Sequence, residues 1–288
     1  MDQITRKAYA KINLGLDVIR RRPDGYHEVK MIMQTVGICD ILTFRKSGRQ
    51  DGAVTLFLDK KELPCGKENL VYRAAELLTR THGLRDGVEI TLEKRIPIAA
   101  GMAGGSTDAA AVFHGMNELF GLSMSLQEMK DLGVGIGADV PYCIQGGTAL
   151  SEGIGEILTA LPSPPAAYLL IAKPDISVST KFVYENLHAD RLQSHPDIDG
   201  MVQALERGSL EGIVSRMENV LETVTVREYP VIHMLKDIMR REGALNALMS
   251  GSGPTVFGVY KTREAAEASR PAVEKSGMAK EIFVTEFV

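Results

Sequence analysis

Apolar and polar residues alternate strictly near the N-terminus of the chain. Every even position of residues 8–18 is apolar, namely Ala8, Ala10, Ile12, Leu14, Leu16 and Val18. This period of two predicts a β-strand with one face buried. Because neighbouring side chains of a strand point to opposite faces, Lys11 and Asn13 lie on the same side, opposite the apolar row. The two polar side chains can therefore act together.

A turn and a second strand follow this first strand. Residues 20–25, RRRPDG, contain a proline, whose φ is fixed, and a glycine, which tolerates positive φ. Residues 26–36 again have the pattern of a strand. The two strands predict a hairpin with Tyr26 and His27 at its mouth.

Apolar residues spaced three and four positions apart predict a helix after the glycine-rich middle of the chain. They run from Ala109 to Phe120, Gly121 stands where helices commonly end, and Ser106 or Thr107 is a suitable N-cap. The same criteria predict further strands at 51–59, 87–92, 168–173, 243–249 and 255–260, and further helices at 68–79, 209–223, 230–241 and 263–275. Strands and helices do not alternate regularly, so the expected fold class is α+β.

The length of the chain predicts two domains. Domains usually hold about 100–200 residues, and this chain has 288. The segment Pro162 to Pro165, PSPP, is stiff and prone to turns. We therefore place a domain change there and expect domains at residues 1–160 and 161–288.

Composition and charge exclude several classes of protein. A hydrophobic fraction of 44% and a charged fraction of 24% indicate a packed globular chain. A net charge of −4 argues against nucleic-acid binding, which usually requires a basic excess. The chain starts without an apolar signal region and has no run of about 18 apolar residues, so neither secretion nor a membrane span is expected. The 3 cysteines form no CxxC pair, which suits a reducing compartment and predicts a cytoplasmic protein.

Residues 97–111, PIAAGMAGGSTDAAA, have the character of a phosphate-binding loop. Glycines let the backbone approach phosphate oxygens, and the N–H groups at a helix start favour an anion. Ser106 can add a hydroxyl to a phosphate or to Mg²⁺. A plain turn before a capped helix is the alternative interpretation. The Gly-Lys-Ser/Thr of a Walker A loop is missing, so the neutralising lysine must come from elsewhere, and Lys11 is the candidate.

Two other glycine clusters are less specific. Residues 133–138, GVGIGA, match the dinucleotide-binding pattern GxGxxA in letters. That pattern needs a strand before it and a helix after it, whereas we predict a helix before it and none after it, so dinucleotide binding is disfavoured. Residues 250–254, SGSGP, join two apolar runs as an ordinary hairpin turn would.

Single polar residues give weaker signals. Asp139 precedes a strand-like apolar stretch, VPYC, which is an unusual setting for a carboxylate, and a cap beside glycine is the alternative. His27 is a candidate ligand or base, whereas the other histidines lack metal-ligand spacing. The absence of a GxSxG elbow argues against a Ser-His-Asp hydrolase.

Three motifs, taken in order, resemble the GHMP small-molecule kinases: AYAKINLGL, PIAAGMAGGSTDAA and MSGSGPTVF. Within that superfamily, RPDGYHEV, GADVPYC and GGTALSEGIGE resemble the enzymes that phosphorylate the 2-hydroxyl of 4-diphosphocytidyl-2-C-methyl-D-erythritol. Those enzymes use ATP and Mg²⁺ and serve non-mevalonate isoprenoid synthesis. The resemblance implies an ATP-binding, catalytic first domain, like a ribosomal-protein domain with a left-handed βαβ crossover. It also implies a ferredoxin-like second domain on the substrate side.

The resemblance also implies roles for individual residues. Lys11 and Asp139 match the catalytic pair. The positions that match substrate contacts are Asn13, Tyr26, His27, Ile154, Thr180 and Tyr184. The positions that match ATP contacts are Asn69, Lys94, Pro97, Ala99, Ala100, Gly101, Met102, Ala103, Gly104, Gly105, Ser106 and Thr107, with Ser106 also a candidate Mg²⁺ ligand.

The chain departs from the family pattern in the glycine-rich segment. Ala99 and Ala100 stand where relatives often have glycine, so we expect that neither needs a positive φ. Thr107 replaces a serine and keeps the hydroxyl. The partner is expected to be a small molecule, with neither nucleic acid nor membrane, and the protein a monomer or homodimer. A homoserine or mevalonate kinase and a non-catalytic nucleotide-binding relative are the alternatives.

Overall fold

The computed structural model describes residues 2–192 and 194–288, which form two compact units. Unit 1 comprises the described part of Met1–Ala10 together with Ile38–Ile96 and Ala103–Gln145. Unit 2 comprises Lys11–Gly37, Pro97–Met102 and the described part of Gly146–Val288. The units interleave along the chain, and the sequence boundary near residue 160 stays a prediction.

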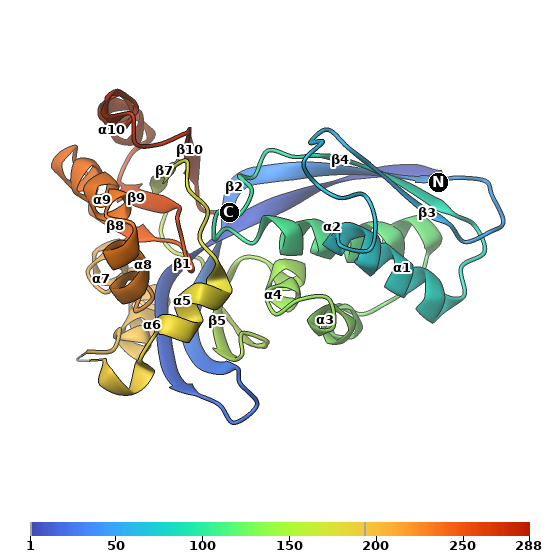
Figure 1. The fold of residues 1–288 in the computed structure, drawn as a ribbon, viewed down its shortest axis with the longest axis horizontal. Coiled ribbons are helices and arrows are strands. Elements are labelled where there is room, and N and C mark those ends of the chain that lie inside the picture. Colours follow the sequence, from blue (N-terminus) through green and yellow to red (C-terminus); the bar gives the residue numbers. More distant parts are fainter. Residues whose placement is uncertain (1, 193) are drawn as a thin grey trace. The chain divides into compact units, whose positions relative to one another are not determined.

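Strands and helices are mixed along the whole chain (Figure 1). The strands are β1 Gln3–Arg21, β2 His27–Lys46, β3 Val54–Leu58, β4 Val88–Glu93, β5 Thr148–Gly153, β6 Ile157–Leu161, β7 Tyr168–Lys173, β8 Asn246–Met249, β9 Val256–Tyr260 and β10 Glu281–Glu286. The helices are α1 Leu70–His82, α2 Gly104–Phe120, α3 Leu126–Val134, α4 Val140–Gln145, α5 Thr180–Asn186, α6 Ile198–Glu206, α7 Leu210–Val214, α8 Glu222–Glu228, α9 Val231–Arg241 and α10 Arg263–Ser276, with a 3₁₀ turn at Ala189–Arg191.

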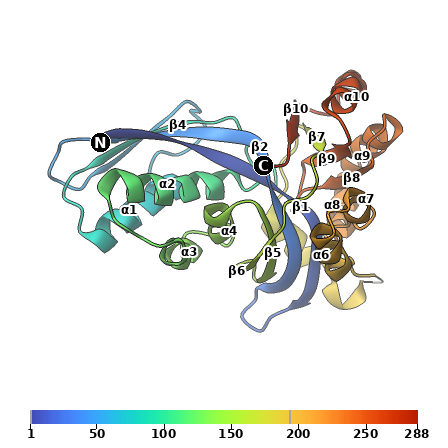
Figure 2. The ribbon, with the colours of Figure 1, turned by 180° about the vertical axis from the view of Figure 1, so that it is seen from behind.

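Unit 1 is a sheet with helices on one face. β4 pairs antiparallel with β2 and parallel with β3, and α1 connects β3 to β4 as a βαβ unit. Figures 1 and 2 show α1 and α2 against the same face of these strands. Phe44, Ile90 and Phe113 are among the fully buried side chains of this core. Burying each such side chain contributes about 1.5–3 kcal/mol, so this face fixes the position of α2.

Unit 2 contains a second, four-stranded sheet in the order β10-β7-β9-β8. All neighbouring strands are antiparallel, and α9 and α10 pack against the sheet. The chain order β7, helices, β8, β9, α10, β10 combined with this spatial order is the ferredoxin-like βαββαβ arrangement. The expected α+β class and ferredoxin-like domain are confirmed. Also within unit 2, β5 pairs antiparallel with β2 and with β6.

Residues 10–18 of β1 are buried on both faces, so the prediction of a half-buried strand is wrong there. Lys11 and Asn13 are 5% and 0% exposed although they belong to the polar row. Ile198 of α6 lies against Gly15 of the same row, and the carboxylate of Asp17 bonds to His195. The pattern did not predict α6, which covers part of this face.

α2 begins earlier than predicted. Its N-cap is Ala103, in the left-handed conformation, so neither Ser106 nor Thr107 caps the helix. The hydroxyl of Thr107 instead donates to the carbonyl of Tyr9 at 2.5 Å. The end of the helix at Gly121, with φ 62°, is confirmed.

The apolar stretch after Asp139 is a helix rather than a strand. VPYC begins α4, whose first turn accepts Pro141 because the missing N–H would have no helical partner there. The helix predicted before the GVGIGA cluster is confirmed as α3, but the prediction that none follows is wrong. The dinucleotide-binding pattern still lacks its preceding strand.

The helix predicted at 209–223 is interrupted. It consists of α7 and α8, and between them Asn219 forms a β-bridge with Leu16 of β1. Tertiary pairing with β1 therefore overrides local helix propensity at this point. The strands β5, β6 and β10 and the helices α5 and α6 were not predicted from the sequence pattern.

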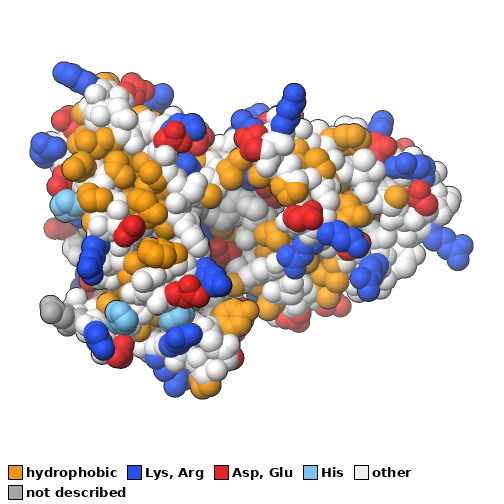
Figure 3. Space-filling view, in the orientation of Figure 1, with side chains coloured by type: hydrophobic (Ala, Val, Ile, Leu, Met, Phe, Trp, Pro, Cys, Tyr) orange, Lys and Arg blue, Asp and Glu red, His pale blue; other side chains and the backbone are white. Residues whose placement is uncertain are grey.

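Acidic and basic side chains are interspersed on the face shown in Figure 3. Within residues 2–192 and 194–288, none of the helices has both the length and the apolar character needed to cross a bilayer.

Candidate active site

The polar row of β1 forms a buried hydrogen-bonded cluster in unit 2. The ammonium of Lys11 donates to Oδ1 of Asn13 at 2.8 Å, and Nδ2 of Asn13 lies 3.2 Å from Sδ of Met31. The backbone N–H of Lys11 donates to the carbonyl of Met102 at 3.2 Å. The strand therefore joins the predicted catalytic lysine and a predicted substrate contact to Met102 of the glycine-rich segment.

The glycine-rich segment has three residues in the left-handed region. The φ values are 51° at Ala99, 71° at Gly101 and 55° at Ala103. The expectation that Ala99 avoids positive φ is wrong, whereas Ala100 does avoid it. The turn geometry imposes this conformation at Ala99 despite its Cβ, at a cost of about 1–2 kcal/mol. The sequence could not show this, because it follows from the path of the whole segment.

Gly101 is the position where only glycine fits. A Cβ there would overlap the carbonyl oxygen of Ser250 and lie 3.0 Å from that of Gly253. The hydroxyl of Ser250 donates to the carbonyl of Gly101 at 3.0 Å. Within unit 2, the SGSGP cluster is thus more than a hairpin turn, because it packs directly on the glycine-rich segment.

The start of α2, in unit 1, has the features of an anion site. No side chain caps this end, so the N–H groups of Gly104, Gly105 and Ser106 are not bonded by a cap residue. The helix dipole adds a partial positive charge at the same end. Among the described residues, the hydroxyl of Ser106 has no hydrogen-bond partner within the chain. A phosphate group fits these donors.

Asn69 and Lys94 have structural partners in unit 1. Asn69 is the N-cap of α1, where its side chain accepts from Val71 N at 2.9 Å. The ammonium of Lys94 lies between the carboxylates of Asp40 (2.5 Å) and Asp108 (2.6 Å). The sequence pattern did not predict this buried cluster. An aspartate within an apolar strand, as at Asp40, was the available signal.

The pKa values of Lys94 and Asp108 in this cluster are both raised. Burial alone would lower the pKa of Lys94, but the carboxylates of Asp108 and Asp40 raise it above its ordinary value. Burial, together with repulsion from Asp40, raises the pKa of Asp108 despite its pairing with Lys94. Oδ1 of Asp108 is buried without a hydrogen-bond partner. Asp108 is therefore costly to ionise in the folded chain.

Asp139 directly precedes α4 in unit 1. Its carbonyl accepts from Cys143 N at 3.0 Å, as the residue before a first helical turn does. The residue is half-buried. Asp139 belongs to unit 1, whereas Lys11 belongs to unit 2.

Two of the predicted substrate contacts, His27 and Tyr184, bring their aromatic rings together near the hairpin mouth in unit 2. The rings of His27 and Tyr184 lie 5.1 Å apart with an interplanar angle of 42°. Tyr26 is 60% exposed at the turn between β1 and β2. Burial, with a smaller contribution from Arg21, lowers the pKa of His27 below its ordinary value, so the ring is neutral at pH 7. A neutral imidazole offers one donor and one acceptor to a ligand.

The remaining predicted substrate contacts lie in unit 2 as well. Thr180 Oγ1 is 2.8 Å from Ser252 Oγ, which connects the start of α5 to the SGSGP cluster. Ile154 lies in the turn between β5 and β6, where its N–H donates to the carboxylate of Glu156 at 2.6 Å. The roles of these residues stay predictions.

Two family models match the chain. The model described as GHMP kinases N terminal domain matches residues 69–147, and the model described as GHMP kinases C terminal matches residues 201–278. The chain is 52% identical over 287 residues to the 4-diphosphocytidyl-2-C-methyl-D-erythritol kinase of Lachnoclostridium phytofermentans, covering 100% of this chain and 98% of the relative. The chain belongs to the 4-diphosphocytidyl-2-C-methyl-D-erythritol kinase family. This confirms the resemblance found in the motifs.

Solved structures agree with membership of this GHMP kinase family. A crystal structure of 4-(cytidine 5'-diphospho)-2C-methyl-D-erythritol kinase superposes with a TM-score of 0.83 at 32% identity, covering 99% of both chains. The homoserine kinase of Cytophaga hutchinsonii superposes with a TM-score of 0.80 at 22% identity, covering 99% of this chain and 95% of the other. The second likeness shows the GHMP kinase fold alone.

Proposed function

We propose that this chain transfers the γ-phosphoryl group of ATP, in the presence of Mg²⁺, to the 2-hydroxyl of 4-diphosphocytidyl-2-C-methyl-D-erythritol. The observation that carries the proposal is the 52% identity, over the full length, to a relative of that name. The 3 cysteines of the sequence form no CxxC pair, which suits a reducing compartment and supports a cytoplasmic reaction.

The donors in the structure fit the phosphates of a nucleotide. The uncapped start of α2 supplies backbone N–H groups and a favourable dipole. Bound ATP with Mg²⁺ would supply the phosphoryl group and neutralise part of its charge. Among the described residues, no cluster of three or more His, Cys, Asp or Glu side chains forms a metal site. This fits Mg²⁺, which proteins commonly bind through few side chains together with phosphates and water, and Ser106 is the candidate side chain.

The residues of the chain then have distinct tasks in the reaction. Asp139 accepts the proton of the attacking hydroxyl, and Lys11 stabilises charge on the transferring phosphoryl group. Asn13 holds the ammonium of Lys11 in place. The Tyr26 ring and the neutral His27 ring stack on and hydrogen-bond to the cytosine. Phosphoryl transfer asks mainly for such positioning and charge stabilisation.

A panel of acceptors tests the substrate. ADP release is measured with ATP and Mg²⁺ in the presence of the cytidylated methylerythritol, homoserine or mevalonate. We expect release only with the first acceptor, because only it carries a cytosine for Tyr26 and His27. Release with homoserine or mevalonate instead would replace the proposed substrate, and nucleotide binding without release on any acceptor would indicate a non-catalytic relative.

A further inference from the structure

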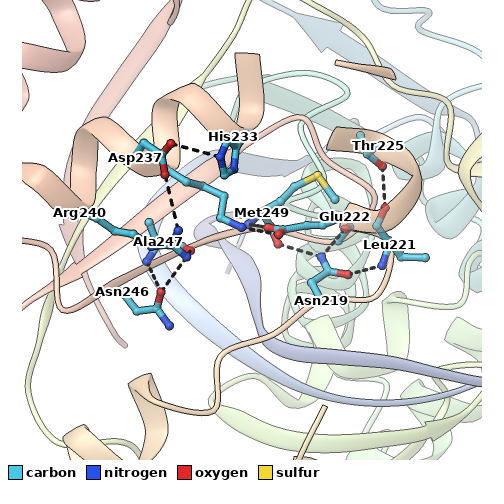
Figure 4. Close-up of polar contacts among 12 residues, drawn as sticks. Asn219, Leu221, Glu222, Thr225, His233, Asp237, Arg240, Asn246, Ala247 and Met249 are labelled. Carbon is cyan, nitrogen blue, oxygen red and sulfur yellow. Dashed lines mark hydrogen bonds and ion pairs between the residues drawn. The ribbon is translucent and has the colours of Figure 1, made fainter. Parts of the chain in front are cut away.

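We name residues 219–225 the clamp segment. Three of its polar side chains bond to the backbone of one hairpin, at Met249 of β8 and in the hairpin loop Ser250–Pro254. Nδ2 of Asn219 donates to the carbonyls of Met249 (2.9 Å) and Gly251 (2.8 Å). Its Oδ1 accepts from Leu221 N at 3.0 Å. Figure 4 shows Asn219 between Met249 and Leu221. Asn219 is 3% exposed and both ends of its amide are bonded, which fixes its orientation.

Two more side chains of the clamp segment reach the same hairpin. Thr225 Oγ1 lies within bonding distance of the carbonyls of Ser252 (3.2 Å) and Leu221 (3.1 Å). Oε1 of Glu222 accepts from Met249 N at 2.8 Å, and its other oxygen pairs with the ammonium of Lys236 on α9. The clamp segment therefore bonds to the hairpin at residues 249, 251 and 252.

The opposite side of the hairpin loop contacts the predicted site within unit 2. Ser250 Oγ donates to the carbonyl of Gly101, and Gly251 lies close to Asn13. The clamp segment is also joined directly to β1, because Val220 N donates to Leu16 O (3.0 Å). Glu218, just before the segment, accepts from Leu16 N (2.9 Å). One short segment thus connects the strand of the predicted catalytic lysine with the loop that supports the glycine-rich segment.

We propose that Asn219 and Thr225 are positioning residues for phosphoryl transfer. They hold the hairpin loop, and the loop holds the backbone of Gly101 relative to β1 and Lys11. The proposal rests on the proposed function, since it assumes that the glycine-rich segment binds the nucleotide phosphates. A misplacement of about 1 Å in a reacting arrangement can cost about 10²-fold in rate, so support of this kind has a measurable kinetic effect.

A pair of threonine variants separates positioning from general stability. Thr225→Val keeps the shape of the side chain and removes the donor to Ser252. Thr223→Val is the matched control, because the hydroxyl of Thr223 donates only to Val220 O (2.7 Å), within the segment itself. We expect Thr225→Val to lower kcat about 2–10-fold, the range of one hydrogen bond, and to raise KM for ATP. We expect Thr223→Val to change neither.

A pair of asparagine variants repeats the comparison with a larger effect. Asn219→Asp keeps the acceptor for Leu221 N but replaces the amide donor with a carboxylate oxygen, which repels the carbonyls of Met249 and Gly251. Asn246→Asp is the control, since Asn246 lies at the far end of β8 and its Nδ2 donates to Val214 O (2.7 Å). Figure 4 shows both asparagines. We expect a loss of about 10–10²-fold in kcat only in Asn219→Asp.

Hydrogen exchange and ATP affinity test the positioning role without depending on global folding or on the acceptor. Hydrogen exchange at the amides of Ser250 and Gly253, which bond to Thr255 O and Ser250 O, should accelerate in Asn219→Asp and Thr225→Val alone. Affinity for ATP should fall in the same two variants. Equal behaviour of each variant and its control, or a lower kcat with wild-type exchange and wild-type KM for ATP, would overturn the proposal. If the wild type binds ATP but phosphorylates no acceptor, the proposed function fails, and the affinity and exchange comparisons still decide the positioning role.

Discussion

Lys11 is the residue whose environment determines most about the site. Lys11 is 5% exposed, and its ammonium donates to Oδ1 of Asn13. Its backbone N–H donates to the carbonyl of Met102. A charge in a poorly solvated setting interacts more strongly than one in water, which suits stabilisation of a phosphoryl group. The acceptor of the phosphoryl group is a hydroxyl, which must lose its proton when the phosphate ester forms. A base is therefore also required, and Asp139 is the proposed one.

Replacing that base gives the test at the scale of single residues. We expect Asp139→Asn to lower kcat by about 10²–10⁴-fold, the usual contribution of general base catalysis, while ATP still binds. Lys11→Met is the paired variant and should also lower kcat. A coupled ADP-release assay measures kcat, and a near-wild-type value in Asp139→Asn would remove Asp139 from the role of base.

Alternation alone predicted that Lys11 and Asn13 share a face, because period two is a property of any strand. It could not predict that this face is buried, since the cover includes α6, far along the chain. The left-handed conformation of Ala99 could not be predicted either, because alanine strongly favours a negative φ. The pairing of Lys94 with Asp40 joins residues on separate elements, and no local pattern contains it.

At the scale of elements, one buried cluster ties three of them together in unit 1. Asp40 lies on β2, Lys94 directly follows β4, and Asp108 lies in the first turns of α2. Asp40 also accepts from the backbone N–H of Arg95 and Ile96. The cluster therefore supports the start of α2, where the phosphate is proposed to bind.

The raised pKa of Asp108 predicts a pH-dependent stability. The folded chain keeps this proton at pH values where the unfolded chain has lost it. The contribution is complete below the ordinary value of 3.8 and is lost as the pH rises through the raised folded-state pKa. Asp108→Asn removes this titration. The Tm of the variant should therefore rise relative to the Tm of the wild type as the pH increases.

Thermal unfolding across the acidic to neutral range measures this difference. Asp131→Asn, which changes an exposed aspartate on α3, is the control for the loss of one charge. A constant difference in Tm between wild type and Asp108→Asn at every pH would contradict the assignment.

The type of an element could be predicted where the periodic pattern was long. The prediction failed where tertiary contacts determined the secondary structure. β7, α9 and α10 have nearly the predicted bounds. The predicted strand at VPYC is α4, because a short apolar run is equally compatible with a buried helix. The predicted helix at 209–223 is broken where the chain pairs with β1.

At the scale of the whole molecule, the two compact units and the ferredoxin-like sheet belong to the GHMP kinase fold, which several activities share. Local patterns gave the α+β class, whereas the motifs in AYAKINLGL, PIAAGMAGGSTDAA and MSGSGPTVF gave the family. The fold therefore cannot select the substrate, and the full-length identity to relatives with a named substrate carries that part of the account.

The position of the transferred phosphoryl group tests the central claim most directly. Carbon 2 of the methylerythritol moiety carries a methyl group, a hydroxyl and no hydrogen. A phosphate ester formed there has no three-bond coupling to a proton. ³¹P NMR of the product made with ATP and Mg²⁺ should therefore show one new monoester singlet beside the two diphosphate signals. A new monoester signal split by protons, or no new ester signal at all, would contradict the account.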